Sequence, residues 1–400
     1  SGFQITKCVA MVPNATTTAA SATVTLTSGT TAGLAIGQLV SGNPNIPAGY
    51  TIATITGPTT FTLSSATGVL AGVGVATTIS TGGYRQVNVG DFTSIGADFG
   101  TISGVITGAG SLAKEGAGIL NLRGANTYTG QTLVRQGTLV VETLGNSASP
   151  GASSVGDSTL GNTNTGAVLL GNGGTAGILE YVGLGEVSDR KIAFSGTTGG
   201  AQIHADGVGA LILTNVVNDV GVGGAKTLNL RGTNAAGNMI TSQLSDNGAA
   251  LNITVDGGAT WILTNSANNY TGTTTIGAGA LGIGNDSALG SGNVDLSNGS
   301  VFAYGADRTI TNPVRLLNNT GPGFMGDYSL TFTSTLQVLA GANNINTLFN
   351  NIAAGKSLTF GNVTADSIGA SRSWTFDGAG ETIISGNFTT STAFGVPIIK

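Results

Sequence analysis

The sequence predicts an all-β protein, a β-solenoid preceded by a small N-terminal antiparallel β domain. Three observations predict this fold. Two segments of the chain nearly repeat each other, charged residues make up only 8% of the 400 residues, and 67 residues are glycine. Stacked repeats bury a core only by covering one another. We therefore expect a function that depends on an extended shape more than on a reaction centre.

The two similar segments share a turn and a closing strand. The first runs from Gly116 to Gly130 and closes with Gly-Thr-Leu at 137–139, and the second runs from Gly257 to Gly272 and closes with Gly-Ala-Leu at 279–281. A shorter echo, Leu-Asn-Leu-Arg-Gly, occurs at 120–124 and again at 228–232. At ~20 residues per coil, the array would contain about 15 coils.

Composition excludes several other classes of protein. The helix formers Glu, Lys, Gln and Arg are scarce, so long helices are disfavoured. Only 14 residues are Lys or Arg and the net charge is −5, which argues against a nucleic-acid partner. The glycines have no three-residue period, which excludes collagen. Glycine at regular corners instead suits a tightly coiled β chain, because corners need positive φ or close backbone approach.

Cysteine content and hydropathy set further limits. Cys8 is the single cysteine, so the chain has no intrachain disulfide; a small buried thiol and an intermolecular bridge both remain open. No run of 18 apolar residues occurs, which predicts no membrane span. The start lacks the charged and apolar regions of a signal peptide, so we expect any signal to have been removed before Ser1.

Residues 1–82 are predicted to form the small β domain, together with an extended N-terminal segment. Short alternating strands are expected at 24–27, 39–40, 50–55 and 60–63, separated by turns rich in glycine and proline. Proline cannot sit inside a central strand. The prolines of this region lie at loop positions, as the predicted turns require: Pro13, Pro44, Pro47 and Pro58.

Residues 83–400 are predicted to form the solenoid. They read as β runs of four to six residues with Gly, Asn, Asp and Ser at the corners, and nothing between them is long enough for a crossover helix. The segment 345–354 could supply one helical turn at most. Corner asparagines could stack as a side-chain amide ladder or serve as plain turn residues. The candidates are Asn126, Asn268, Asn269, Asn343, Asn344 and Asn362.

The block 116–130, with Val134 and the Gly-Thr-Leu at 137–139, resembles the autotransporter-associated β-strand repeat of bacterial surface and secreted proteins. That family reads Gly-x-Gly-Thr-Leu-x-Leu-x-Gly-x-Asn-x-Tyr-x-Gly, then Gly-x-Leu. In the second copy, Ala259 replaces a glycine, Trp261 replaces a leucine, and one residue is added before Tyr270.

The resemblance implies a right-handed parallel β-helix, export from the cell and a role as stalk, adhesin or fibre. It carries no catalytic residues to transfer. The chain reaches Lys400 without the amphipathic strands of a translocator barrel. We therefore expect either that this part was cut off or that the protein reaches the surface by another route.

A search for chemistry finds no convincing reaction centre. His204 is the only histidine, and no Gly-x-Ser-x-Gly elbow accompanies it. Two carboxylate groups could serve a glycan-cleaving site or could be ordinary turn and loop residues: Asp91 with Asp98, and Glu180 with Glu186 and Asp189. Arg190 and Lys191, next to Asp189, are interpreted as a surface pair. The sequence therefore predicts no enzyme, and no catalytic, cofactor-binding or metal-binding residues.

Aromatic side chains offer a possible sugar-binding surface. The candidates are Trp261, Trp374, Tyr128 and Tyr270. Trp261 aligns with Leu120, which occupies an inward position of the repeat. Buried packing is therefore favoured over a sugar platform.

The two ends of the chain suggest how copies of an extended β-helix could assemble. The open ends of a β-helix carry unpaired backbone groups, which an added strand could cover. We expect apolar residues at both ends to dock on neighbouring copies, and head-to-tail contacts of this kind give a filament. The predicted assembly residues are Phe3, Ile5, Val9, Phe394, Val396, Ile398 and Ile399.

The leading functional expectation is a non-enzymatic extracellular subunit of a bacterial surface filament, fibre or layer, with copies of itself as partners. The alternative is a monomeric adhesin or glycan-binding passenger domain on a β-helical stalk, with surface glycans as partners. A phage tail-fibre component is a third alternative, because residues 37–55 resemble small β modules of phage and bacterial surface proteins.

Overall fold

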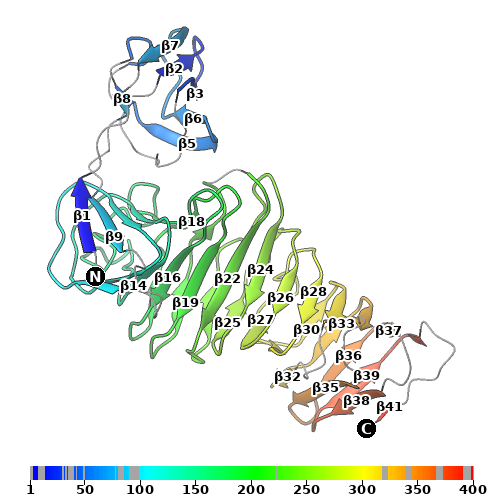
Figure 1. Ribbon diagram of the computed structural model, residues 1–400. Coiled ribbons are helices and arrows are strands. Elements are labelled where there is room, and N and C mark those ends of the chain that lie inside the picture. Colours follow the sequence, from blue (N-terminus) through cyan, green and yellow to red (C-terminus); the bar gives the residue numbers. More distant parts are fainter. Residues whose placement is uncertain are drawn as a thin grey trace. The chain divides into compact units, whose positions relative to one another are not determined.

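A computed structural model describes residues 3–7, 14–28, 31, 34, 40–41, 43–47, 50–76, 78–79, 85–89, 99–220, 223–317, 323–338, 345–365, 373–390 and 398–399. Across these ranges the protein is built from β-strands without any helix. No helix long and apolar enough to cross a membrane therefore occurs in them. The strands form a small antiparallel sheet and a parallel β-solenoid of about 11 turns (Figure 1), which confirms the predicted fold class.

The solenoid has fewer turns than the repeat period suggests, because many turns are longer than the regular one. Ala280 lies beside Ser300, an offset of 20 residues. Leu330 lies beside Leu358, and the offset there is 28 residues. The longer turns keep the strand register and place the added residues in loops.

The chain divides into two compact units, which we describe separately. Unit 1 comprises Ser1–Gln202, Asn215–Lys226 and Asn247–Ala249, and unit 2 comprises Ile203–Thr214, Thr227–Asp246 and Ala250–Lys400. Strands β19 (Ala201–Ala205) and β22 (Lys226–Gly232) contain residues of both units.

The antiparallel sheet of unit 1 lies within residues 14–76 and has its own apolar core. Val24, Ile52 and Phe61 are fully buried, whereas the residues beside Val24 in its strand are exposed, as the alternating sequence predicts. In spatial order its strands are β5 (Ile52–Gly57), β6 (Thr60–Leu63), β3 (Thr23–Leu26), β2 (Asn14–Thr17) and β7 (Gly72–Ala76), and β4 (Val40–Ser41) pairs with β8 (Thr78–Ile79).

The solenoid strands of unit 1 stack in register, so that like residues form columns. Leu120 lies beside Leu139, and Leu139 lies beside Leu179; all three are fully buried. Burying each such side chain contributes roughly 1.5–3 kcal/mol. One sheet contains β1 (Phe3–Lys7), β9 (Arg85–Val89), β11 (Leu112–Glu115), β13 (Thr132–Val134), β15 (Val168–Leu170), β18 (Ile192–Phe194) and β21 (Val216–Val217). A second sheet contains β10 (Phe99–Ile102), β12 (Ile119–Leu122), β14 (Thr138–Val141) and β16 (Gly177–Tyr181), and β17 (Glu186–Ser188) is the first strand of a third sheet.

Unit 2 is also built from parallel ladders, three in number among its described residues, and Figure 1 shows strands β24, β26 and β28 side by side. The first ladder contains β24 (Leu251–Val255), β26 (Thr274–Ile276), β28 (Val294–Leu296), β31 (Val314–Leu316), β34 (Leu336–Val338), β37 (Val363–Ala365) and β40 (Phe388–Thr390). The second contains β20 (Leu211–Leu213), β23 (Asn238–Ile240), β25 (Thr260–Leu263), β27 (Ala280–Ile283), β29 (Ser300–Ala303), β32 (Gly323–Gly326), β35 (Ile345–Ile352), β38 (Ser373–Asp377) and β41 (Ile398–Ile399). The third contains β30 (Arg308–Ile310), β33 (Leu330–Phe332), β36 (Ser357–Phe360) and β39 (Glu381–Ile384).

One local expectation is wrong. The segment 345–354 does not form a helical turn, because Ile345–Ile352 is the strand β35. This strand pairs in parallel with β32 on one side and β38 on the other. Pairing with β38 over residues 345–349 and with β32 over residues 349–352 outweighs the weak local preference of a short segment for helix.

The buried asparagine of each repeat copy is explained by its hydrogen bonds to the neighbouring turns of the solenoid. Asn126 accepts a hydrogen bond from the backbone N of Ile106 (2.8 Å) and donates one to the backbone O of Ser154 (2.7 Å). In the second copy, Asn268 accepts from Leu244 N (2.8 Å) and donates to Ala288 O (2.7 Å). These two side chains bond backbone groups of neighbouring turns, so they do not form an amide ladder.

The other predicted ladder candidates divide into two groups. The backbone N of Asn269 donates to Leu244 O. Asn362 Oδ1 accepts a bond from the backbone N of Asn387 (2.9 Å), which again joins a side chain to backbone. Asn343 and Asn344 lie outside the described residues.

The closing glycine of each repeat is required by its backbone. Gly137 has a φ of 69° and Gly279 a φ of 71°, which side chains of L-residues rarely tolerate. A Cβ atom would also lie 2.4 Å from the carbonyl O of Gly118 or 2.5 Å from that of Ala259. Any other residue at these corners would therefore push adjacent turns apart.

Candidate functional site: a loop insertion anchored by Arg190

One turn of the solenoid in unit 1 carries a long loop, residues 142–166, which we call the insertion. It lies between β14 and β15. Thr138 pairs with Ile178 on the next turn, an offset of 40 residues, so the regular register resumes after the loop. The insertion contains no strand, and short bridges join Asn126 to Ser153 and Asn146 to Ser149. Insertions in a solenoid project as loops, which are the usual binding surfaces of repeat proteins.

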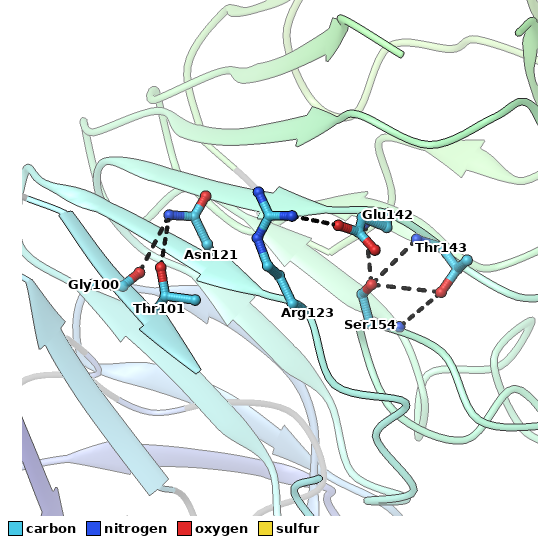
Figure 2. Close-up of polar contacts among 7 residues, drawn as sticks. All are labelled: Gly100, Thr101, Asn121, Arg123, Glu142, Thr143 and Ser154. Atoms are coloured by element: carbon cyan, nitrogen blue, oxygen red, sulfur yellow. Dashed lines mark hydrogen bonds and ion pairs between the residues drawn. The ribbon is translucent and has the colours of Figure 1, made fainter. Parts of the chain in front are cut away.

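The entrance to the insertion is fixed by polar contacts, shown in Figure 2. Ser154 Oγ accepts hydrogen bonds from the backbone N atoms of Glu142 (3.1 Å) and Thr143 (3.2 Å). Ser154 N donates in return to Thr143 Oγ1 (3.0 Å). Beside them, Arg123 Nη1 lies 2.7 Å from Glu142 Oε1 in an exposed ion pair. The loop therefore folds back onto its own first residues.

Arg190 anchors the interior of the insertion. Its side chain is 1% exposed, and its guanidinium donates to five oxygen atoms of the loop. The acceptors are the backbone O of Leu144 (2.5 Å), Gly156 (3.2 Å), Asp157 (3.1 Å) and Gly166 (2.7 Å), and Ser153 Oγ (3.3 Å). A guanidinium suits this role because it presents several N–H donors in a rigid plane.

Two carboxylates beside Arg190 hold the first residues of the loop. Glu186 accepts hydrogen bonds from the backbone N of Leu144 (2.6 Å) and Gly145 (3.2 Å). Asp189 accepts one from Ser147 N (2.7 Å) and a short one from Ser147 Oγ. Burial raises the pKa of the Glu186 carboxyl, while the two backbone N–H donors and Arg190 oppose that shift.

The tip of the insertion is exposed, and its two exposed runs, 148–152 and 159–165, contain no charged residue; the nearest charges are the carboxylate of Asp157, between the runs, and Lys191 Nζ, 2.7 Å from Asn164 Oδ1. Its exposed residues are Ala148, Ser149, Pro150, Gly151 and Ala152, and Thr159, Leu160, Asn162, Thr163, Asn164 and Thr165. Leu184, in the loop before the anchoring residues, is 85% exposed. The site therefore presents hydroxyl, carboxamide and a few apolar groups on a loop whose base is held by buried hydrogen bonds.

The interpretation of Arg190 and Lys191 as a surface pair is wrong. Arg190 is buried and bonds the insertion, and Lys191 Nζ lies 2.5 Å from Asp219 Oδ2. The reason is that the carbonyl groups of the loop converge from residues distant in sequence, and no local pattern reveals them. One signal could have found the site: Glu186, Asp189 and Arg190 concentrate charge in five residues of a chain that is poor in charge.

The structure shows where three of the predicted carboxylate residues lie: Glu180, Glu186 and Asp189. Glu186 and Asp189 bond the backbone of the insertion, as described above, so their oxygens hold a loop. Glu180 lies on β16 and is half-buried. Asp91 and Asp98 lie outside the described residues.

His204 lies on β19 and is half-buried. Burial lowers the pKa of its imidazole, the carboxylate of Asp206 raises it, and the positive charge of Arg231 lowers it.

The aromatic candidates belong to the core where the structure describes them. Trp261 is fully buried and donates from Nε1 to Arg231 O (3.0 Å). Tyr128 and Tyr270 are buried, and their hydroxyls bond Thr132 Oγ1 (2.5 Å) and Thr274 Oγ1 (2.7 Å). Buried packing is thus confirmed for these three residues. The side chain of Trp374 lies outside the described part of the structure.

The predicted assembly residues lie near both ends of the chain. Phe3 and Ile5 are on β1, which pairs antiparallel with β9, opposite Val89 and Val87. Ile398 and Ile399 are on β41, which pairs in parallel with β38. Val9, Phe394 and Val396 lie outside the described residues. Docking between copies stays a prediction, and the strands β1 and β41 each pair within the chain.

Comparison with known proteins agrees with the stacked repeats. The profile of the passenger-associated-transport-repeat family matches residues 112–141 and 253–283, which contain the two similar segments. The adhesin BmaC autotransporter of Brucella suis biovar 1 (strain 1330) is 32% identical over 300 residues. The match covers 67% of this chain and 8% of that protein, and no solved structure matches the chain. The chain belongs to the family of autotransporter passenger β-repeat proteins.

Proposed function

We propose that this chain is a non-enzymatic part of a cell-surface adhesin passenger, in which the solenoid is a stalk and the insertion is a binding surface. The observation that carries this proposal is the insertion itself. A long loop held from beneath by Arg190, Glu186 and Asp189 is the arrangement expected of a preorganised binding surface, because little conformational entropy remains to be lost on binding.

The surface of the tip favours a neutral polar ligand. Its exposed side chains are hydroxyls, carboxamides and small apolar groups, and no charged residue is exposed at 148–152 or 159–165. Such a surface offers hydrogen bonds without the strong field that would select an acidic or basic partner. We therefore propose surface glycans, or the glycosylated surface of a host protein, as the class of ligand.

Support for the adhesin is greater than for a self-assembling filament. The similar protein of Brucella suis is described as an adhesin.

Binding of the 400-residue chain to a glycan array and to host cells, through coated beads, tests the proposal. The test variant carries Ser149→Lys and Asn162→Lys at the tip, and the matched control carries Ser291→Lys and Asn298→Lys on exposed turns of unit 2. We expect the tip variant to lose about tenfold or more in affinity and the control to bind like the parent chain. Equal binding by all three chains, or regular polymers in electron micrographs with no binding, would contradict the proposal.

A further inference from the structure

A buried lysine lies beside a buried side-chain amide in unit 1. Lys226, at the start of β22, is 2% exposed, and Asn218, which follows β21, is 7% exposed. Lys226 Nζ lies 3.0 Å from Asn218 Oδ1. Because Oδ1 is bonded directly to the amide carbon Cγ, this hydrogen bond holds the amine next to an electrophilic carbon, and it polarises the C=O bond of the amide.

The surroundings of the pair favour the reactive form of the amine. Val216 and Val220 are buried beside it in the sequence, and Val220 belongs to an apolar cluster with Leu133 and Ala193. Burial lowers the pKa of Lys226 to about 8, and the carboxylate of Asp219 opposes that shift. A larger fraction of neutral amine is therefore present near neutral pH than on an exposed lysine.

Comparison with two other lysines shows which feature distinguishes Lys226. Lys114 is also fully buried, but its Nζ donates to the backbone O of Glu115 (2.9 Å), Gly116 (2.6 Å) and Gln136 (3.1 Å). Lys191 Nζ lies 2.7 Å from Asn164 Oδ1, but that contact is exposed and Lys191 is ion-paired with Asp219. Among these three lysines, Lys226 alone combines burial with a side-chain amide whose nitrogen could leave.

We infer that Lys226 and Asn218 form an intramolecular isopeptide bond. The neutral Nζ of Lys226 attacks Cγ of Asn218, and a new C–N bond forms. The bond between Cγ and Nδ2 then breaks, and the nitrogen leaves as ammonia after it takes up a proton released by Nζ. No atom changes oxidation state, so the reaction needs no cofactor.

The bond would close a covalent loop from residue 218 to residue 226, at the point where the chain leaves β21 and enters β22. A closed loop cannot extend when the chain is pulled or unfolded, so the corner would keep its connection in the unfolded state. This property suits a protein exposed to mechanical load at a surface, and it does not depend on what the insertion binds.

Proteolysis of the denatured 400-residue chain tests the inference. A protease that cleaves before aspartate separates residues 206–218 from residues 219–245, because Asp206, Asp219 and Asp246 are successive aspartates. We expect the two peptides to remain joined, with Asp219 as a free N-terminus and with a total mass lower by one ammonia. Succinimide formation at an asparagine also loses ammonia, but it would let the peptides separate.

Two variants complete the experiment. Lys226→Arg should give separate peptides with no ammonia lost from them, whereas the matched variant Lys114→Arg should keep them joined. The parent chain is itself the decisive sample, so the result does not depend on how well either variant folds. Separate, unmodified peptides 206–218 and 219–245 from the parent chain would overturn the inference.

Discussion

The two repeat copies make the same buried contacts but are followed by loops of different length. This difference shows where the solenoid tolerates an inserted loop. In both copies a buried asparagine bonds the turn before and the turn after, and a buried tyrosine hydroxyl bonds a threonine four residues on. After the first copy, Asn126 reaches Ser154 inside the insertion. After the second, Asn268 reaches Ala288 in a turn of regular length.

The same side chain therefore accepts a short turn or a long loop as its next partner. The asparagine amide requires a carbonyl oxygen within hydrogen-bond distance on the next turn, because burying an amide without a hydrogen-bond partner costs free energy. The insertion supplies that oxygen only because Arg190 and Glu186 hold the loop down. A β-solenoid can thus acquire a long loop in one turn if new buried contacts anchor it.

The largest expected effect is at the anchor. Arg190→Met removes all five hydrogen bonds to the loop and leaves Glu186 without its neighbouring positive charge. We expect the free energy of unfolding of unit 1 to fall by about 3–5 kcal/mol, and the second copy, which has no such anchor, to keep its structure. Both tryptophans, Trp261 and Trp374, belong to unit 2, so hydrogen exchange of unit 1 peptides in increasing denaturant measures the loss; an unchanged transition would contradict the role of Arg190.

The next effect compares the two asparagines directly. Asn126→Ala and Asn268→Ala each remove two buried hydrogen bonds, so each should cost about 2–4 kcal/mol. The costs should be similar, because the lost contacts are the same in kind. If Asn126→Ala proves much milder than Asn268→Ala, the insertion tolerates the loss of its contact with the core, and the comparison between the copies fails.

A pH titration separates the copies by their buried ionisable groups. Burial lowers the pKa of Lys114 from its ordinary 10.5 to about 8, with Glu115 opposing, and raises the pKa values of Tyr128 and Tyr270 above their ordinary 10.0. Between about pH 8 and 10 the unfolded chain binds more protons at Lys114, so stability rises with pH. Above pH 10 the unfolded tyrosines lose protons first, so stability falls.

The variant Lys114→Met checks this assignment. It should remove the contribution of Lys114 to the rise in stability between about pH 8 and 10 and leave the fall above pH 10. The second copy, residues 253–283, contains no lysine and should contribute to the fall alone. Thermal melts at a series of pH values give both slopes; a rise as steep as in the parent chain would exclude Lys114 as a cause.

The smallest effect is expected at the entrance to the insertion. Arg123 and Glu142 form an ion pair whose side chains are 54% and 44% exposed. Arg123→Ala should therefore cost less than about 1 kcal/mol, and the difference should shrink in high salt. A loss as large as that of Arg190→Met would mean that the entrance, and not the anchor, holds the loop.

The fold was open to prediction because its determinants repeat along the sequence. Gly137 and Gly279, Tyr128 and Tyr270, and the inward-facing leucines recur at fixed spacing, and each recurrence reflects the same contact between turns. The strand at 345–352 escaped prediction because its partners, β32 and β38, define it more than its own residues do.

The anchor of the insertion was predicted least well. Its contacts join Arg190 to carbonyl groups 24 to 46 residues away in the sequence, and a charged residue beside a lysine is usually at the surface. Only the concentration of charge at 186–190, in a chain with few charges, marked the place.

Hydrogen exchange of backbone amides in the native chain tests the central claim most directly. Amides at the base of the insertion, including those of Leu144, Ser147 and Ser154, donate to acceptors at the base of the loop: Glu186, Asp189 and Thr143. They should exchange as slowly as the amides of β13 and β14, while those of the tip exchange fast. Fast exchange across all of residues 142–166 would show that the loop is not anchored and would contradict the account.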